Sequence, residues 1–258
     1  MEKNIITLEA GNSPNSRGLF SFVNQFLAAC FFYDKNEQIH VTFDLIKKSS
    51  YYDSSIIYED NVWFYFFVRK DIKPLSEKKI VWTEVKNKYG YDFNFNNSEE
   101  REVAEIIINK YLNIKPSIEQ KINFFYKNNF KGKKVLGVHK RGTDIGIHFE
   151  KKNIEIYYQE IDKIIHDYDA IFLCTDQKIV VDEFKKKYDK VIHYSYDSLS
   201  TDEKPSFKSS SKDKFKNGED AIIDAFLLSK CNFLIQTNSN LSNFSLLANS
   251  KLKFKRII

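Results

Sequence analysis

The chain has 258 residues, of which 42% are hydrophobic, and its 40 Lys and Arg residues against 35 Asp and Glu residues give a formal net charge of +5. This length and apolar content suffice for a full core in one large or two small domains. The positive excess is spread along the chain without an Arg-rich stripe or zinc-type spacing, which argues against nucleic acid and for smaller anions or a membrane surface as partners.

The three cysteines, Cys30, Cys174 and Cys231, are far apart, and each lies in an apolar run. They are typical of buried free thiols in a reducing compartment rather than of a disulfide or metal framework. The first residues contain no apolar core of a signal peptide, and no apolar run approaches the roughly 20 residues that span a bilayer. We therefore expect a cytoplasmic protein.

The N-terminal residues predict a βαβ unit. Residues 4–8 favour a strand, residues 9–18 a loop, residues 19–33 a largely buried helix and residues 38–43 a second strand. A loop that enters a helix offers backbone N–H groups to an anion. Asn12, Ser16, Arg17 and Gly18 therefore either meet a ligand or form a plain connection.

The middle of the chain predicts a third strand, over residues 79–83, and then two helices. The first covers residues 98–113, with Ser98 as its N-cap and with Val103, Ile106, Ile107 and Tyr111 on one face. The second covers residues 117–128 and follows Pro116. Residues 128–132 then form the expected junction between two halves.

The stretch 133–144, KKVLGVHKRGTD, is the one around which the chain is organised. It predicts a buried strand over residues 135–138 that ends in polar residues, where open α/β sheets place their chemistry. Arg141 is one of only five arginines among forty cationic residues. Its planar fork can grip phosphate oxygens in pairs, which Lys cannot do. The alternative is an exposed loop arginine paired with Asp144.

The rest of the chain alternates helices and strands. We expect helices over residues 154–167, 180–188, 219–229 and 243–248, and strands over residues 170–174, 190–194 and 232–236. The polar segment 195–217 predicts a mobile loop, either a lid or an insertion. Thr237 to Ser242 place hydroxyls and amides at a helix entrance, which favours an anion site. The order of elements predicts an α/β fold with a doubly wound parallel sheet and one ligand edge.

Three motifs in this order carry a family resemblance: GVHKRGTD with Tyr157, IFLCTDQ at 171–177 and EDAIIDAFLLSKCNFLIQTNSNLS at 219–242. Together they resemble the nucleotide-sugar half of GT-B fucosyltransferases of the α-1,6 and nodulation group, whose signature is a strand ending in His-x-Arg-Arg-x-Asp. The resemblance implies a GT-B-like fold of two Rossmann-like halves with parallel sheets facing a cleft. The domains would be residues 1–130 on the acceptor side and 131–258 on the nucleotide-sugar side.

The same resemblance implies a metal-independent inverting fucosyltransferase that needs no cofactor. It would transfer fucose from GDP-fucose, or the sugar of another GDP-sugar, to a surface polysaccharide, lipopolysaccharide or other glycan. Arg141 matches an arginine that contacts the donor diphosphate. Asp176 matches an acidic residue that helps to bind the base or ribose, and Asp224 matches a carboxylate that binds guanine. The implied donor site consists of His139, Arg141, Tyr157, Thr175, Asp176, Asp224, Asn238, Ser239, Asn240, Ser242 and Gly18. The aromatic segment 51–68 would lie on the acceptor side, with Tyr51, Tyr52 and Trp63 as sugar-stacking candidates, although such rings are also ordinary core residues.

Two departures from the signature concern the catalytic residues. The second arginine is Gly142 here, with Lys140 as a possible substitute. The family's acidic base has no clean counterpart, and His148 and Glu150 bracket its position. We therefore carry Arg141, Asp144, His148 and Glu150 as catalytic candidates, with Asp144 expected to fix the loop.

Three further alternatives stay open. A metal-dependent GT-A transferase could use Asp167 and Asp169 as metal ligands. A protein of the GT-B fold could bind a nucleotide or sugar without turnover. The basic residues Lys251, Lys253, Lys255 and Arg256 either rest on anionic lipid as a peripheral membrane contact or form a solvated tail.

Overall fold

The computed structural model describes residues 2–10, 17–33, 35–45, 49–84, 93–141, 153–194, 199–201 and 213–257. Within these residues the chain forms two parallel sheets. The smaller has the order β2-β1-β3 and consists of β1 (Glu2–Glu9), β2 (Ile39–Asp44) and β3 (Lys73–Val81). The larger has the order β6-β5-β4-β7-β8 and consists of β4 (Val135–Lys140), β5 (Ala170–Thr175), β6 (Val191–Ile192), β7 (Phe233–Gln236) and β8 (Lys253–Arg256). The predicted α/β fold with two parallel sheets is confirmed.

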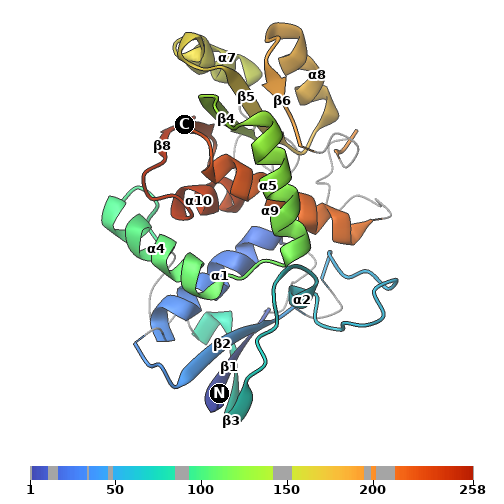
Figure 1. Ribbon diagram of the computed structural model, residues 1–258, viewed down its shortest axis with the longest axis vertical. Coiled ribbons are helices and arrows are strands. Elements are labelled where there is room, and N and C mark those ends of the chain that lie inside the picture. The colour runs from blue at the N-terminus through green and yellow to red at the C-terminus, as the bar shows by residue number, and fades with distance from the viewer. Residues whose placement is uncertain are drawn as a thin grey trace.

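Helices separate the two sheets, as Figure 1 shows. The helices α1 (Leu19–Tyr33), α4 (Ser98–Tyr111), α5 (Pro116–Asn129), α9 (Lys214–Ser229) and α10 (Asn240–Leu247) lie between the small sheet at the bottom of the view and the large sheet toward the top. Their apolar side chains, together with the short helix α2 (Trp63–Phe66), form one core that includes residues of both sheets. One packed layer of helices therefore joins the two halves.

The outer face of the large sheet has a core of its own. The helices α7 (Ile154–Asp162) and α8 (Lys178–Lys187) cover it, and the 3₁₀ turn η2 (Ile165–Asp167) follows α7. Leu136, Val138 and Ile171 point to this face, whereas Val135 and Phe172 point to the helices between the sheets. A parallel sheet that is covered on both faces needs such apolar runs, which made its strands recognisable in the sequence.

Two predictions about α4, its N-cap and its buried face, are wrong. Its N-cap is Asn97 and not Ser98, because the Asn97 side chain accepts hydrogen bonds from the N–H groups of Glu99 and Glu100. Its buried residues are Arg101, Ala104, Ile107 and Ile108, whereas Val103 and Ile106 are exposed. The Arg101 side of the helix faces inward, where the guanidinium group donates hydrogen bonds to carbonyl oxygens at the end of α10 and just after it. Apolar periodicity cannot reveal such a contact.

Three predicted boundaries also change. The strand β3 begins at Lys73 and not at residue 79, because its first residues are polar and exposed at the edge of the small sheet. The strand β4 continues through His139 and Lys140, which were expected in a loop. Residues 214–217 of the predicted mobile loop belong to α9, which Asp213 caps through a hydrogen bond from the N–H of Lys216 at 2.7 Å.

The basic C-terminal residues do not form a solvated tail. Residues 253–256 are the edge strand β8, and the Arg256 guanidinium lies 4.3 Å from the centre of the Phe95 ring. Lys253 and Lys255 stay exposed on this strand. Peripheral membrane contact through these lysines remains a prediction.

Candidate active site

The carboxyl ends of three strands meet at one edge of the large sheet. In the parallel register His139 of β4 lies between Cys174 of β5 and Gln236 of β7, and Lys140 lies beside Thr175. His139, Cys174 and Gln236 therefore form a polar row on the face that meets α9 and α10. Lys140 belongs to the opposite face, with its ammonium group 6.0 Å from the centre of the Tyr157 ring. Ligands of open α/β sheets bind outside such an edge.

Arg141 follows β4 directly and reaches the start of α10. One of its terminal nitrogens, Nη1, donates a hydrogen bond to the Ser239 hydroxyl at 3.4 Å. Ser239 is the N-cap of α10 in extended conformation, and Asn240 is the first residue of the helix. A guanidinium group beside a helix N-terminus combines a permanent positive charge with N–H groups that have no partner within the helix. This arrangement suits an anion such as a diphosphate.

The turn before α10 is held by its own side chains. The Ser242 hydroxyl, which is buried, donates to the carbonyl oxygens of Thr237 and Ser239 at 3.3 and 3.4 Å. The Asn243 side-chain amide donates to the Asn238 side-chain oxygen at 3.0 Å. Ser242 and Asn238 therefore shape the turn, while Ser239 and Asn240 lie at its helix end.

The start of α1 lies beside the start of α10. The Asn24 amide donates to the Asn240 side-chain oxygen at 3.3 Å, and the rings of Phe20 and Phe244 are 4.8 Å apart. Gly18 directly precedes α1, whose first N–H, that of Leu19, donates to the Tyr51 hydroxyl at 2.9 Å. The first turns of α1 thus pack against the first turns of α10, which brings an element of the N-terminal half to the helix that Arg141 reaches.

His139 is buried and uncharged at neutral pH. Burial, followed by the charge of Arg141, lowers the pKa of His139 to about 3. Its Nδ1 atom is buried and has no hydrogen-bond partner among the described residues. The Tyr157 hydroxyl, which is also buried, donates to the His139 carbonyl oxygen at 3.3 Å. Tyr157 therefore fixes the end of β4 from the outer face.

A second group of site residues lies where β5 meets α9. Asp176 follows Thr175 at the end of β5, and Asp224 projects from α9. The Cys174 thiol donates to Oδ2 of Asp224 at a sulfur–oxygen distance of 3.5 Å. Burial, followed by the charge of Asp220, raises the pKa of Asp224 well above its usual value. Sequence reasoning named Asp224 but not Cys174 or Gln236, because only the register of the strands reveals these two neighbours.

The aromatic acceptor candidates lie mainly in the core. Tyr51 and Trp63 are each only 3% exposed, and the Trp63 ring lies 4.9 Å from that of Phe43 and 4.1 Å from that of Phe67. Tyr52 is partly buried against the same core. The placement of Tyr51 and Trp63 matches the core alternative, so their role in stacking on an acceptor stays a prediction that the structure does not favour.

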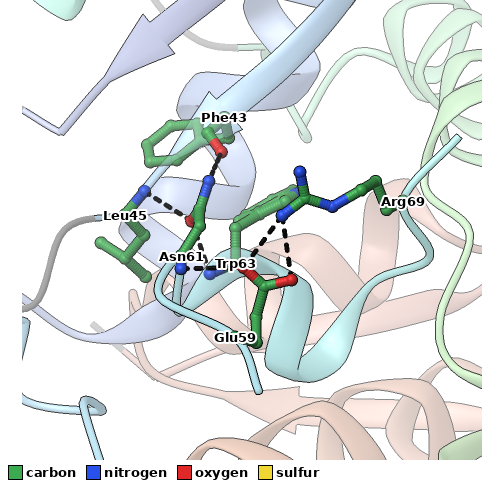
Figure 2. A network of polar contacts seen from close by, with 6 residues as sticks. All are labelled: Phe43, Leu45, Glu59, Asn61, Trp63 and Arg69. Carbon is green, nitrogen blue, oxygen red and sulfur yellow. Dashed lines mark hydrogen bonds and ion pairs between the residues drawn. The ribbon is translucent and has the colours of Figure 1, made fainter. Parts of the chain in front are cut away.

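Polar contacts hold the backbone at the start of α2, as Figure 2 shows. The Asn61 side chain accepts from the N–H groups of Leu45 and Trp63, both at 3.0 Å, and donates to the Phe43 carbonyl oxygen at 2.8 Å. Glu59 accepts two hydrogen bonds of 2.9 Å from Arg69. A cavity of about 710 Å³ adjoins this network, and its wall includes Trp63 and residues of β1, β2 and β3.

The remaining candidate residues either lie away from Arg141 or are not among the described residues. Asp144, His148 and Glu150, like Asn12, Ser16 and Gly142, are not among the described residues. Asp169 accepts from the Lys134 N–H at 2.7 Å and, with Asp167, precedes β5, so both lie at the sheet edge opposite Arg141. Among the described residues, no three His, Cys, Asp or Glu side chains gather as metal ligands.

Comparison with solved structures gives the class of protein. The fucosyltransferase NodZ from Bradyrhizobium superposes with a TM-score of 0.59 at 16% sequence identity, covering 96% of this chain and 93% of that one. A NodZ α-1,6-fucosyltransferase soaked with GDP-fucose gives 0.58 at 17% identity over the same shares. POFUT1 in complex with GDP gives 0.52 at 10% identity over 98% and 97% of the two chains. The fold is that of the GT-B glycosyltransferases, so the GT-A alternative is wrong.

The family follows from the sequence comparison. The model of the family described as Nodulation protein Z (NodZ) matches residues 93–257, which is more than half of the chain. The chain belongs to the NodZ family and is an enzyme of the fucosyltransferase class. No curated protein sequence gives a significant match. None of the helices that the structure describes combines the length and apolar character needed to cross a membrane.

Proposed function

We propose that the protein transfers fucose from GDP-fucose to a glycan acceptor by a metal-independent, inverting reaction. The observation that carries this proposal is the position of Arg141, whose guanidinium group lies beside Ser239 at the N-terminus of α10. Membership of the NodZ family supports it, as do the relatives whose structures were solved with GDP-fucose or GDP.

The proposed chemistry requires stabilisation of the departing diphosphate. Arg141 would bind its oxygens as a charged fork, and the first N–H groups of α10 would add their positive field. These groups supply the charge that a divalent cation provides in metal-dependent transferases. His139, uncharged because its pKa is lowered to about 3 by burial and by Arg141, would contribute a hydrogen bond rather than a charge.

The proposed nucleotide specificity depends on Asp176 and Asp224. Both lie where β5 meets α9, on the sheet edge that carries Arg141. A carboxyl oxygen can accept from the N–H groups at the Watson–Crick edge of guanine, whereas adenine presents an acceptor at the corresponding ring nitrogen. We therefore assign Asp224 to the base and Asp176 to the base or ribose.

The proposed acceptor is a surface polysaccharide, lipopolysaccharide or other glycan. It would approach from the side of residues 1–130, where the β1 to α1 connection ends at Gly18. The residues that bracket the expected base position, His148 and Glu150, belong to the segment that follows Arg141 in sequence, as does Asp144, which we expect to fix the loop.

Calorimetric titration tests the donor assignment. GDP, UDP, CMP and ADP are titrated in the presence of EDTA into the wild type, Arg141→Ala and the control Arg69→Ala, which removes an arginine that pairs with Glu59. We expect selective GDP binding that weakens by about 10- to 100-fold in Arg141→Ala, because a charged hydrogen-bonding group contributes about 1.5–3 kcal/mol. Arg69→Ala should bind GDP like the wild type.

Two results would contradict this proposal. The first is binding of UDP only after Mn²⁺ is added, which would indicate a metal-dependent donor site. The second is equal loss of GDP affinity in both arginine variants, since this would indicate a general charge effect rather than a diphosphate contact.

A further inference from the structure

The contact between Cys174 and Asp224 joins the strand β5 to the helix α9. The two residues are 50 positions apart in sequence, and the thiol sulfur lies 3.5 Å from Oδ2 of the carboxyl group. Cys174 is buried, and burial raises the pKa of its thiol well above the usual value. The sulfur therefore keeps its proton and acts as the donor.

The second oxygen of Asp224, Oδ1, lacks a hydrogen-bond partner among the described residues, although it is buried. The nearest ammonium group on α9, that of Lys216, lies 2.9 Å from Asp220, one turn before Asp224. A buried acceptor without a partner costs free energy, so we expect a donor from a ligand or a water molecule to satisfy it.

The thiol also limits how the carboxyl group can turn. Rotation about the last side-chain bond of Asp224 by less than a half-turn would move Oδ2 away from the sulfur and break the hydrogen bond, so the contact favours one orientation of the carboxyl plane. Cys174 itself cannot move far, because it lies in β5 and pairs with His139 of β4. The strand thus holds the thiol, and the thiol holds one oxygen of the carboxyl group.

We propose that Cys174 is a positioning residue for donor recognition, whose thiol fixes Asp224 so that Oδ1 accepts a hydrogen bond from an N–H group on the base of the donor nucleotide. The inference rests on the proposed function, in which Asp224 binds the base. It adds a residue that acts through Asp224 and does not itself touch the donor. Guanine presents N–H donors at N1 and at its 2-amino group, which can satisfy Oδ1, whereas adenine has an acceptor at N1 and no amino group at C2.

Nucleotide titrations of thiol variants test the proposal. Cys174→Ala removes the donor, Cys174→Val removes it while largely keeping the buried volume, and Cys174→Ser restores an O–H donor. Cys231→Ala is the matched control, because Cys231 is also a buried thiol but donates to the Leu227 carbonyl oxygen. GDP and ADP are titrated into each protein, and thermal unfolding establishes that each variant is folded.

We expect Cys174→Ala and Cys174→Val to bind GDP about fivefold or more weakly, since a single hydrogen bond contributes roughly 1 kcal/mol. Their weak affinity for ADP should not change, so the ratio of the two affinities falls. Cys174→Ser should recover most of the GDP affinity, and Cys231→Ala should keep it. If the thiol only stabilised the fold, its removal would change the affinities for GDP and ADP by the same factor.

Two outcomes would overturn the proposal: wild-type GDP selectivity in folded Cys174→Ala or Cys174→Val, or a Cys174→Ser variant as weak as Cys174→Ala. Either result leaves the proposed function intact, because GDP selectivity of the wild type is measured separately. A wild type that does not prefer GDP to ADP would instead contradict the proposed function itself.

Discussion

At the scale of single residues, the sequence was most informative about Arg141. Its rarity and its place after a buried strand marked it before any contact was known, and the structure places it at the start of α10. His139 was harder to interpret, because whether a histidine at the end of a strand is exposed depends on the elements that cover it. The contact of Cys174 with Asp224 depends on how β5 meets α9, so no local pattern could predict it.

The burial of His139 predicts a loss of stability in acid. The unfolded chain binds a proton at His139 near pH 6.5, whereas the folded chain does so only near its lowered pKa of about 3. Between these values the unfolded state binds more protons, so stability falls as the pH falls. We expect this histidine alone to reduce the free energy of unfolding by about 2 kcal/mol from pH 7 to pH 5.

Urea unfolding at pH 7 and pH 5 measures this change. The difference between the two pH values should shrink by about that amount in His139→Gln, which cannot titrate. The control His166→Gln changes a histidine that is exposed on η2 and should retain the wild-type difference. An unchanged difference in His139→Gln would show that His139 does not remain neutral in the folded chain.

At the scale of elements, apolar patterns predicted the buried ones best. The bounds of α1 agree with the prediction at both ends, because nearly all of its residues are apolar and a loop precedes it. The strand β3 and the first turn of α9 were missed for the opposite reason. Their residues are polar and exposed, and only pairing with β1 and the cap at Asp213 define them.

The true N-cap of α4 can be tested directly. Asn97→Ala should lower the free energy of unfolding by about 1 kcal/mol, because it removes the acceptor for the N–H groups of Glu99 and Glu100. Ser98→Ala should have almost no effect, since Ser98 is already the first residue of the helix. Chemical denaturation of both variants compares them, and a larger loss in Ser98→Ala would return the cap to the residue that the sequence favoured.

At the scale of the whole molecule, the sequence predicted two halves but not how closely they are joined. The helix α5 belongs to the expected N-terminal half, yet its Phe125 ring lies 6.0 Å from that of Phe172 in the large sheet. Arg101 of α4 donates to the carbonyl oxygens of Leu246, Asn249 and Leu252 at 2.7 to 3.1 Å. We therefore propose that the halves 1–130 and 131–258 unfold as one unit.

Two probes can test this cooperativity. Both tryptophans, Trp63 and Trp82, lie in the N-terminal half, so their fluorescence follows that half while far-UV circular dichroism follows the whole chain. We expect coincident denaturation curves. Arg101→Met should shift both curves together by about 3 kcal/mol or more, because it leaves buried carbonyl oxygens without partners. Arg69→Met, at an exposed ion pair, should shift them by less than about 1 kcal/mol.

Separate curves for the two probes would indicate that the halves unfold independently. A shift of the fluorescence curve alone in Arg101→Met would also indicate independent unfolding. In that case the boundary between the two cooperative units would lie between α4 and α10.

The charged edge of the small sheet also affects how the protein behaves in concentrated solution. Among the described residues, the strand β3 pairs only with β1, so no other described strand covers its second side. Natural proteins protect such edges from recruiting a strand of another molecule with lysines and prolines. This strand carries Lys73, Lys78 and Lys79, with Pro74 at its second position. The polar residues that concealed β3 in the sequence therefore protect the folded protein against aggregation.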